Sequence, residues 1–381
     1  MTNENRPVII AGGGIGGLSA AIALRRAGFE AQVYERAPEL REVGAGISLW
    51  PNATRQLRRL GVLDEVVRRG FVFRGGSIRS WNGRVLVRMS VGGHDEPSVL
   101  IHRAALHSAL AEALPVWAVT TGATAEDFTD EGDGVRVSFA GLGEVEGAAL
   151  VGADGLRSAV RRRLLDDGEP VYRGYPVWRG VAEDADKLPG TDELTESLGA
   201  GLRFGVVPIG GGRVAWWATA NEPEGSDDGA EGPRAKLLRL FAGWHAPIPQ
   251  LLEATPEEEI LKNDSYDRPP VRGWGRGRVT LLGDAAHPTT PNMGQGGCMA
   301  IEDGAVLAGA LVRHAEIPAA LRDFERRRYR RVAGIVRQSL RYGQVAQWER
   351  PAAVRLRDTL FRLTPDAFSD LAMKRMFAFQ A

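Results

Sequence analysis

The chain has 381 residues, which is long enough for more than one packed domain. Its 48 basic and 48 acidic residues cancel, so the net charge does not indicate nucleic acid or an anionic membrane surface as a partner. A single cysteine, Cys298, excludes an internal disulfide framework and a multi-cysteine metal site, and it is typical of a reducing, cytoplasmic setting.

The first elements are predicted as a strand at 8–11, a glycine-rich turn, a helix at 18–27 that ends at Gly28, and a strand at 31–35. Two parallel strands joined by one helix form a βαβ unit. The apolar stretch 8–24 contains five glycines and continues into an arginine-bearing helix, so we interpret it as this unit and not as a signal peptide. No other run is long enough for stable membrane insertion.

The rest of the chain alternates between strand-like and helical patterns. Strands are predicted at 71–73, 84–88, 135–139, 149–153, 175–181, 203–208, 214–219 and 279–282. A turn at Asn82-Gly83 separates the first two. Helices are predicted at 104–114, at 234–243 and from Gln295 onward, with breaks near Pro318 and Pro351. We interpret the arginine-rich run 326–331 as one charged helix face.

This order predicts an α/β protein in three parts. We expect a discontinuous Rossmann-type domain at 1–72, 99–170 and 271–315. An inserted, mixed β-sheet domain is expected at 73–98 and 171–270, and C-terminal helices at 316–381.

The first motif is Gly12-x-Gly14-x-x-Gly17, which follows a strand and opens a helix. Glycines let the backbone turn tightly and approach a pyrophosphate at the positive helix N-terminus. Glu35 follows 18 positions after the last glycine and is placed to accept hydrogen bonds from ribose hydroxyls. The motif indicates a dinucleotide but does not separate FAD from NAD.

The second motif begins with Gly283-Asp284 at the end of a strand and continues through Pro291 to the run 294–297. An aspartate there can hold a ribityl hydroxyl. The glycine run lets backbone N–H groups reach a flat ring, and the next helix N-terminus favours the negative charge of a reduced flavin. The alternative is a capped loop before a helix.

The third motif, residues 151–161, contains Asp154 between a strand and an arginine-bearing helix. One interpretation is a site for a second anionic or polar ligand. The other, equally favoured, is an ordinary helix N-terminus with solvated arginines.

Together, these motifs resemble the single-component FAD-dependent aromatic hydroxylases, the 4-hydroxybenzoate hydroxylase-like superfamily. The string 291–303 looks like the branch with zeaxanthin epoxidases, urate hydroxylases and salicylate hydroxylases. The resemblance covers about residues 7–345. It implies non-covalent FAD that is reduced by transiently bound NADH or NADPH. Oxygen from O2 would then add at flavin C4a, and the hydroperoxyflavin would oxygenate a small aromatic, heterocyclic or polyene substrate.

The resemblance also implies roles for individual positions. The cofactor-binding residues it implies are Gly12, Gly14, Ile15, Gly16, Gly17, Glu35, Arg36, Gly46, Ile47, Arg103, Asp154, Asp284, Gly296 and Gly297. The stretch 43–47 would follow the flavin edge. Pro291, Gly294 and Gln295 would surround flavin C4a and N1, with no side-chain acid or base assigned.

Aromatic residues concentrate in the β-rich insert, and we predict Tyr175, Arg203 and Trp216 as substrate residues. Arg203 aligns with an arginine that contacts substrate in the urate hydroxylases. Arg179 lies in the same region, and either arginine could bind an anion or simply be solvated. No histidine pair has metal-ligand spacing, so we expect no metal.

Other interpretations stay open. A flavin reductase or another non-oxygenating flavoprotein would carry the same motifs, and so would a flavin-binding sensor. A halogenase Trp-x-Trp-x-x-Pro signature is absent. We expect a monomer or homodimer with a small-molecule substrate and no nucleic acid partner.

Overall fold

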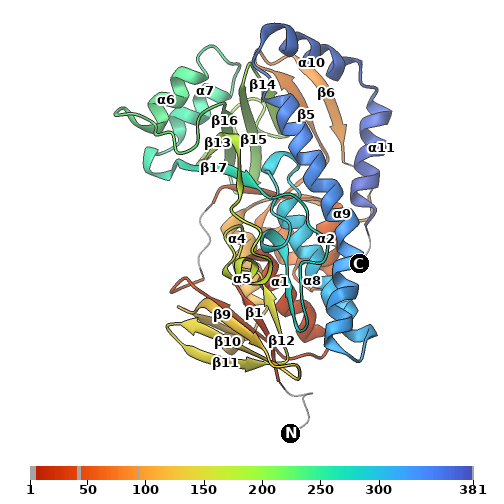
Figure 1. The fold of residues 1–381 in the computed structure, drawn as a ribbon. Helices are drawn as coiled ribbons and strands as arrows, with labels where there is room; N and C mark the ends of the chain where they lie inside the picture. The colour runs from red at the N-terminus through yellow and green to blue at the C-terminus, as the bar shows by residue number, and fades with distance from the viewer. Residues whose placement is uncertain (1–5, 41–43, 92–93, 380–381) are drawn as a thin grey trace.

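The computed structural model describes residues 6–40, 44–91 and 94–379. Its lower half in Figure 1 is built on a five-stranded parallel sheet with the order β18-β12-β1-β2-β8. The strands are β1 (Val8–Ala11), β2 (Ala31–Glu35), β8 (Val119–Thr121), β12 (Ala149–Gly152) and β18 (Val279–Leu281). All four pairings are parallel, which confirms the predicted βαβ unit and the α/β class.

Apolar helices cover this parallel sheet. The main pair is α1 (Ile15–Arg26) and α8 (Gly296–Arg313), which pack side by side. A Cβ on Gly304 of α8 would lie 2.9 Å from the backbone nitrogen of Ala20 in α1, so glycine permits this approach. The remaining helices of this half are α2 (Pro51–Arg59), α3 (Leu63–Arg69), α4 (Arg103–Glu112) and α5 (Ala159–Leu165).

A three-stranded antiparallel sheet is attached to the lower half between β8 and β12. Its strands are β9 (Thr124–Asp130), β10 (Val135–Ala140) and β11 (Gly143–Gly147). Phe139 of β10 stacks on Tyr34 of β2 at 4.4 Å between ring centroids, which fixes this sheet against the parallel one.

The upper half is a seven-stranded mixed sheet with the order β17-β13-β16-β15-β14-β5-β6. Its strands are β5 (Gly75–Ser80), β6 (Val85–Ser90), β13 (Val171–Ala182), β14 (Leu194–Leu198), β15 (Leu202–Gly210), β16 (Arg213–Ala220) and β17 (Leu261–Asp267). One face packs against α6 (Gly232–Leu240) and α7 (Ile248–Ala254) around a separate apolar cluster. The opposite face is directed toward the lower half.

One strand pairing differs from the sequence prediction. The hairpin at Asn82-Gly83 joins β6 to β5, a strand that the sequence did not predict. The run 71–73 is β4 (Phe71–Phe73), which instead pairs with β7 (Ser98–His102) in a small sheet that also contains β3 (Gly46–Leu49). Two glycines at the start of β5 weaken its strand pattern, which explains the error.

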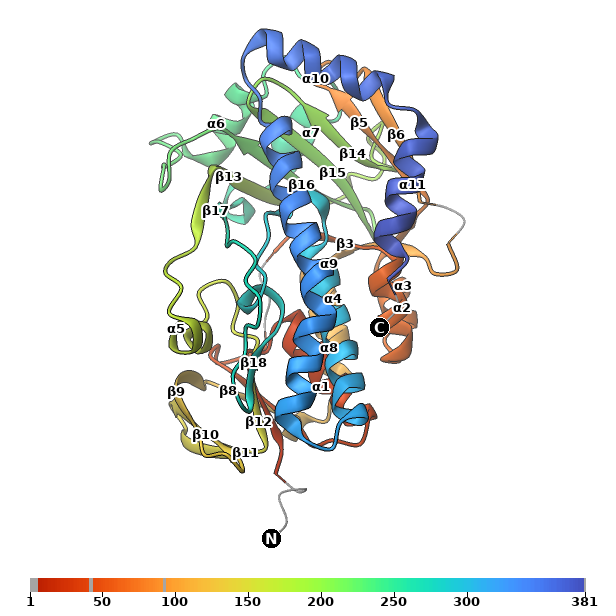
Figure 2. The same cartoon turned by 45° about the vertical axis from the view of Figure 1, so that its right-hand side comes forward.

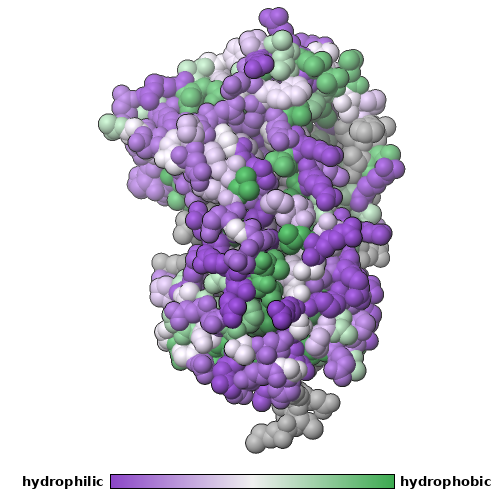
Figure 3. All heavy atoms as spheres, viewed as in Figure 1, coloured by the Kyte–Doolittle hydropathy of each residue, from purple (hydrophilic) through white to green (hydrophobic). Residues whose placement is uncertain are grey.

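The C-terminal helices connect the two halves. Helix α9 (Ile317–Ala346) rises along both, α10 (Pro351–Leu363) lies over the top, and α11 (Asp366–Phe377) descends beside β6 (Figure 2). Pro318 and Pro351 stand in the first turns of α9 and α10, so the predicted breaks are confirmed. None of the described helices is both long and apolar enough to cross a membrane. The face in Figure 3 is mostly hydrophilic, with scattered apolar residues.

Candidate active site

The first glycine-rich turn is closed by direct backbone contacts. Gly12 has a φ of +110°, and a Cβ there would lie 2.3 Å from the carbonyl oxygen of Ala153. A Cβ on Gly17 would lie 2.0 Å from the carbonyl oxygen of Gly12. Gly14, at the N-cap of α1, has no side chain with which to cap the helix. The turn therefore requires glycine, and it presents the start of α1 to a ligand.

Glu35 braces this turn from the end of β2. Its carboxylate accepts hydrogen bonds from the backbone N–H groups of Gly13 at 2.6 Å and Ala37 at 2.9 Å. Arg36 next to it is exposed. Ribose binding by Glu35 stays a prediction.

The second turn follows β18 and leads into α8. Gly294 has a φ of +59°, and Gln295 at the N-cap of α8 makes no side-chain capping bond. A Cβ on Gly297 would lie 2.8 Å from Cδ1 of Ile47, so β3 lies close against this turn. Since α1 and α8 pack side by side, two helices without capping side chains begin in the same region.

Buried charges that the sequence did not predict hold the second turn. Asp303 accepts hydrogen bonds from the Gly283 N–H at 2.9 Å, from His287 at 2.7 Å and from Arg328 at 2.5 Å. Burial alone would raise the pKa of Asp303, but the charges of His287 and Arg328 outweigh it and lower the pKa. His287 is therefore a structural residue.

The arginine-rich run on α9 is not a single solvated face. Arg328 is fully buried and also pairs with Glu302 at 2.7 Å, and Arg331 reaches the same carboxylate. The two carboxylates inside the otherwise apolar helix α8 could have indicated these ion pairs from the sequence, because buried carboxylates need partners.

The third motif has a structural role in this fold. Asp154 accepts hydrogen bonds from the Ser158 hydroxyl and from the N–H groups of Ala159 and Val160, so it caps α5. Burial raises the pKa of Asp154 despite these bonds. Arg161 is fully buried, not solvated, and donates to the carbonyls of Ala285 and Ala286 at 2.9 and 2.8 Å. The motif thus anchors the second turn.

A cavity of about 910 Å³ separates the two halves. Several predicted residues line it: Gly46, Ile47, Arg103, Asp284, Pro291, Gly294, Gly296, Gly297 and Arg203. Its walls do not include the first turn at 12–17, Glu35, Arg36 or Asp154. Val43 of the predicted flavin-edge stretch lies outside the described residues, whereas 44–47 line the cavity.

The sheet register decides which insert residues face this cavity. Arg179 lies opposite Trp217, and Trp217 lies opposite Gly205. The Trp217 ring lies directly over Gly205: a Cβ at Gly205 would be 2.0 Å from the indole nitrogen. Successive side chains alternate between faces, so Trp216 points the other way.

Three sequence predictions are corrected here. Trp216 is fully buried against α7, donates to Thr255 at 2.8 Å and does not line the cavity, while Trp217 does. The Tyr175 hydroxyl contacts Asn292, but the residue is not part of the cavity wall. Gln295 is buried and accepts a hydrogen bond from Asn52 at 3.1 Å, away from the cavity.

Arg203 faces the cavity within a closed network. It is 1% exposed, binds Glu196 through Nε at 2.7 Å and donates to Asn292 at 2.6 Å. Tyr342 donates to the other Glu196 oxygen at 2.6 Å. Burial alone would lower the pKa of Arg203, but the charge of Glu196 outweighs it and raises the pKa. Asn292 also donates to the backbone carbonyl of Ser339 in α9, and its bond from Arg203 ties the second turn to the upper half.

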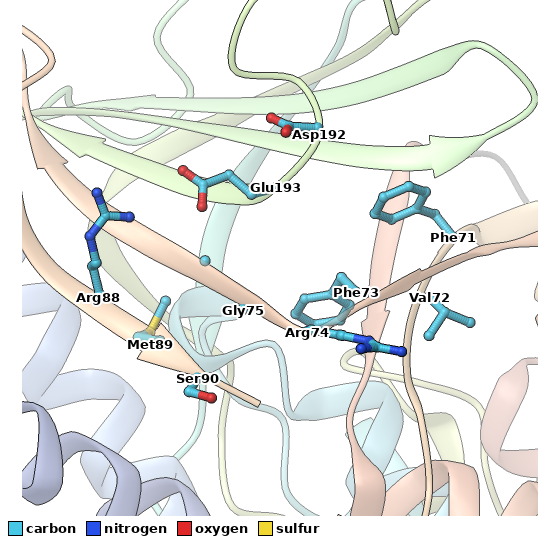
Figure 4. A pocket seen from close by; sticks show the side chains of 11 residues that line it. Phe71, Val72, Phe73, Arg74, Gly75, Arg88, Met89, Ser90, Asp192 and Glu193 are labelled. Carbon is cyan, nitrogen blue, oxygen red and sulfur yellow. The ribbon is translucent and has the colours of Figure 1, made fainter. Parts of the chain in front are cut away.

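A second, open cavity of about 530 Å³ lies beside β4, β5 and β6 (Figure 4). Charges of both signs line it, from Arg74 and Arg88 to Asp192 and Glu193. It shares Met89 with the larger cavity but contains neither glycine-rich turn. The candidate active site is therefore the larger cavity.

The residues present fit a flavin dinucleotide. Two neighbouring helices begin without capping side chains, and each preceding turn approaches its surroundings too closely for a Cβ at Gly12, Gly17 or Gly297. The fixed backbone contacts at Gly12 and Gly17 suit a diphosphate, whereas Gly297 meets only the tip of the Ile47 side chain, at a turn that suits the edge of a flat ring.

The comparisons with known proteins agree with this geometry. Residues 5–339 match the family model described as FAD binding domain. The chain is 46% identical over 376 residues to an aurachin C monooxygenase/isomerase of Stigmatella aurantiaca, with 98% of each chain covered. It is 35% identical over 337 residues to an FAD-dependent urate hydroxylase of Klebsiella pneumoniae subsp. pneumoniae, with 86% of this chain and 87% of that protein covered.

Solved structures give the same result. Klebsiella pneumoniae HpxO complexed with FAD and uric acid matches with a TM-score of 0.90 at 30% identity, and the match covers 99% of this chain and 97% of that chain. The chain therefore belongs to the FAD-binding family and is an FAD-dependent monooxygenase that consumes NAD(P)H and O2.

Proposed function

We propose that this enzyme oxygenates a small, flat aromatic or heterocyclic molecule. The observation that carries the proposal is the position of Trp217, whose ring faces the cavity that Pro291, Gly294 and Gly297 also line. An indole face binds flat rings by stacking. The aurachin C monooxygenase/isomerase and the urate hydroxylase support this substrate class.

The FAD would be held by both glycine-rich turns. We assign the diphosphate to the start of α1, with Gly12, Gly14, Ile15, Gly16 and Gly17, and the adenosine ribose to Glu35 beside Arg36. Asp284 and Arg103 would hold the ribityl and diphosphate region. Gly46, Ile47, Gly294, Gly296 and Gly297 would surround the ring. When bound, the flavin accepts hydride from NAD(P)H and activates O2.

The protein itself would position the substrate. Trp217 would fix the plane of the substrate ring, while the Arg203, Glu196 and Tyr342 network holds the wall behind it. Asn292 keeps the second turn at a fixed position relative to that wall. A cavity closed to water favours oxygen transfer over loss of the oxidant as H2O2.

The test is a screen of the purified holoprotein. We expect a flavin spectrum, and NAD(P)H consumption that rises with aromatic or heterocyclic compounds without equivalent H2O2 release. With ¹⁸O2, one labelled oxygen should appear in the product. Turnover without label would favour the alternative, a flavin reductase of the same fold.

Cofactor assignment has its own test. Asp284→Ala should lower FAD occupancy, measured as the ratio of flavin to protein absorbance. Asp127→Ala, on the exposed edge strand β9, is the matched control and should retain FAD. Equal occupancy in the two variants would contradict the role of Asp284. A cytoplasmic location and a monomeric or homodimeric state remain predictions.

A further inference from the structure

Arg179 occupies the cavity side of β13. Its neighbour Trp178 is fully buried on the opposite face, so alternation directs Arg179 toward the cavity that it lines. Its guanidinium donates to the side-chain oxygen of Asn263 at 3.3 Å, which is a neutral partner. Within residues 6–40, 44–91 and 94–379, no carboxylate forms an ion pair with Arg179.

Two other cations of this wall, Arg203 and Lys262, are neutralised by carboxylates. Arg203 pairs with Glu196, and Lys262 pairs with Asp228 at 3.0 Å and Glu222 at 3.6 Å. Arg179 instead shares the cavity wall with a second arginine, Arg103. Burial, together with the positive charge of Arg103, lowers the pKa of Arg179 to about 10.

Arg179 is only partly buried, so its guanidinium is accessible from the cavity. A planar guanidinium without an acidic partner matches the two oxygens of a carboxylate or phosphate. Trp217 lies directly opposite Arg179 in the register, so a ring stacked on the indole would hold its substituents near the guanidinium.

We infer that Arg179 is the binding residue for an anionic oxygen group of a small molecule in this cavity. The inference rests on the proposed function, because the two possible sources of the anion are the ring substrate and the nicotinamide dinucleotide. In the first case the group is a carboxylate or ionised hydroxyl on the ring. In the second it is a phosphate of NADH or NADPH.

The experiment compares the holoenzyme with Arg179→Gln, Arg179→Lys and Arg84→Gln. Arg84 is an exposed hairpin residue outside both cavities, so its variant controls for the loss of one charge. One arm titrates benzoate and its neutral analogue benzamide and follows the flavin absorbance difference. The second arm measures the second-order rate constant of flavin reduction by NADH and NADPH. Neither readout requires oxygenation, so failure of the proposed reaction would be seen separately.

If the anionic group belongs to the ring substrate, we expect benzoate to bind the wild-type enzyme more tightly than benzamide. Arg179→Gln should weaken benzoate by about 10- to 100-fold and leave benzamide within twofold. If the anionic group belongs to NADH or NADPH, the second-order rate constant of flavin reduction should be lower in the same variant by a similar factor. Arg179→Lys should recover part of either loss, and Arg84→Gln should match wild type.

Three results would overturn the inference. One is a loss of FAD in Arg179→Gln, because the arginine would then belong to the resident cofactor. Another is wild-type behaviour of Arg179→Gln in both arms. The third is equal weakening of benzoate and benzamide with unchanged flavin reduction, which would indicate a packing role.

Discussion

The two halves of the molecule build their parts of the site in different ways. In the lower half, contiguous turns at 12–17 and 283–297 each follow a parallel strand and open a helix. In the upper half, the wall is assembled across strands: Arg179 from β13, Trp217 from β16, Arg203 from β15 and Glu196 from β14. Substitutions in these two turns should therefore affect cofactor retention, whereas those in the upper half should change ligand choice or stability while FAD remains bound.

The largest effect is expected for Gly12→Ala. The new Cβ would meet the Ala153 carbonyl at 2.3 Å in a backbone with φ of +110°, which we expect to cost about 2–5 kcal/mol and to leave the protein without FAD. Flavin absorbance and thermal unfolding measure both. Gly28→Ala is the control, since it has a φ of +92° but nothing within 4 Å. A flavin-replete Gly12→Ala protein would contradict this view of the turn.

Glu196→Gln tests the upper half. It leaves the buried Arg203 without its counter-charge, so the free energy of unfolding should fall by about 3–5 kcal/mol while FAD is retained. Chemical denaturation followed by flavin and tryptophan fluorescence provides the measurement. Glu231→Gln, in an exposed pair with Arg239, should cost less than about 1 kcal/mol. Equal stability of the two variants would show that Arg203 does not depend on Glu196.

The adjacent tryptophans provide a sharper comparison within one strand. Trp216→Leu should lower the free energy of unfolding by about 2–3 kcal/mol and leave the KM for substrate nearly unchanged, because its ring belongs to the core beside α7. Trp217→Leu should raise that KM with a smaller loss of stability. The reverse pattern would mean that the register places the other face toward the substrate.

The smallest effect concerns Cys298 at the start of α8. Its thiol is fully buried, and burial raises its pKa to about 12, so at pH 8 a fraction on the order of 10⁻⁴ is thiolate. Native holoprotein should resist iodoacetamide at pH 8, and one thiol should react after denaturation. Rapid native labelling would show that the second turn opens readily.

Most of the nucleotide half could be predicted because its signals are local. The strand, turn and helix around Gly12 to Gly17 follow one another without interruption from Val8 to Arg26, and the close contacts at Gly12 and Gly17 explain why the pattern contains glycine. The breaks at Pro318 and Pro351 are local for the same reason. Asp303 and Arg328 were missed because their pairing joins two helices and depends on helix packing.

The substrate wall could not be read in the same way. A strand's alternation shows that Trp216 and Trp217 lie on opposite faces, but only the packing of α7 against the sheet decides which face is core. Arg179 and Arg203 likewise share a residue type and a strand-like context. They differ because Glu196, which comes from another strand, pairs with Arg203 and not with Arg179. The sequence by itself determined a flavin-type dinucleotide site from contiguous turns. The tertiary structure decided which arginine remains available to a ligand, because ion pairing depends on cross-strand register.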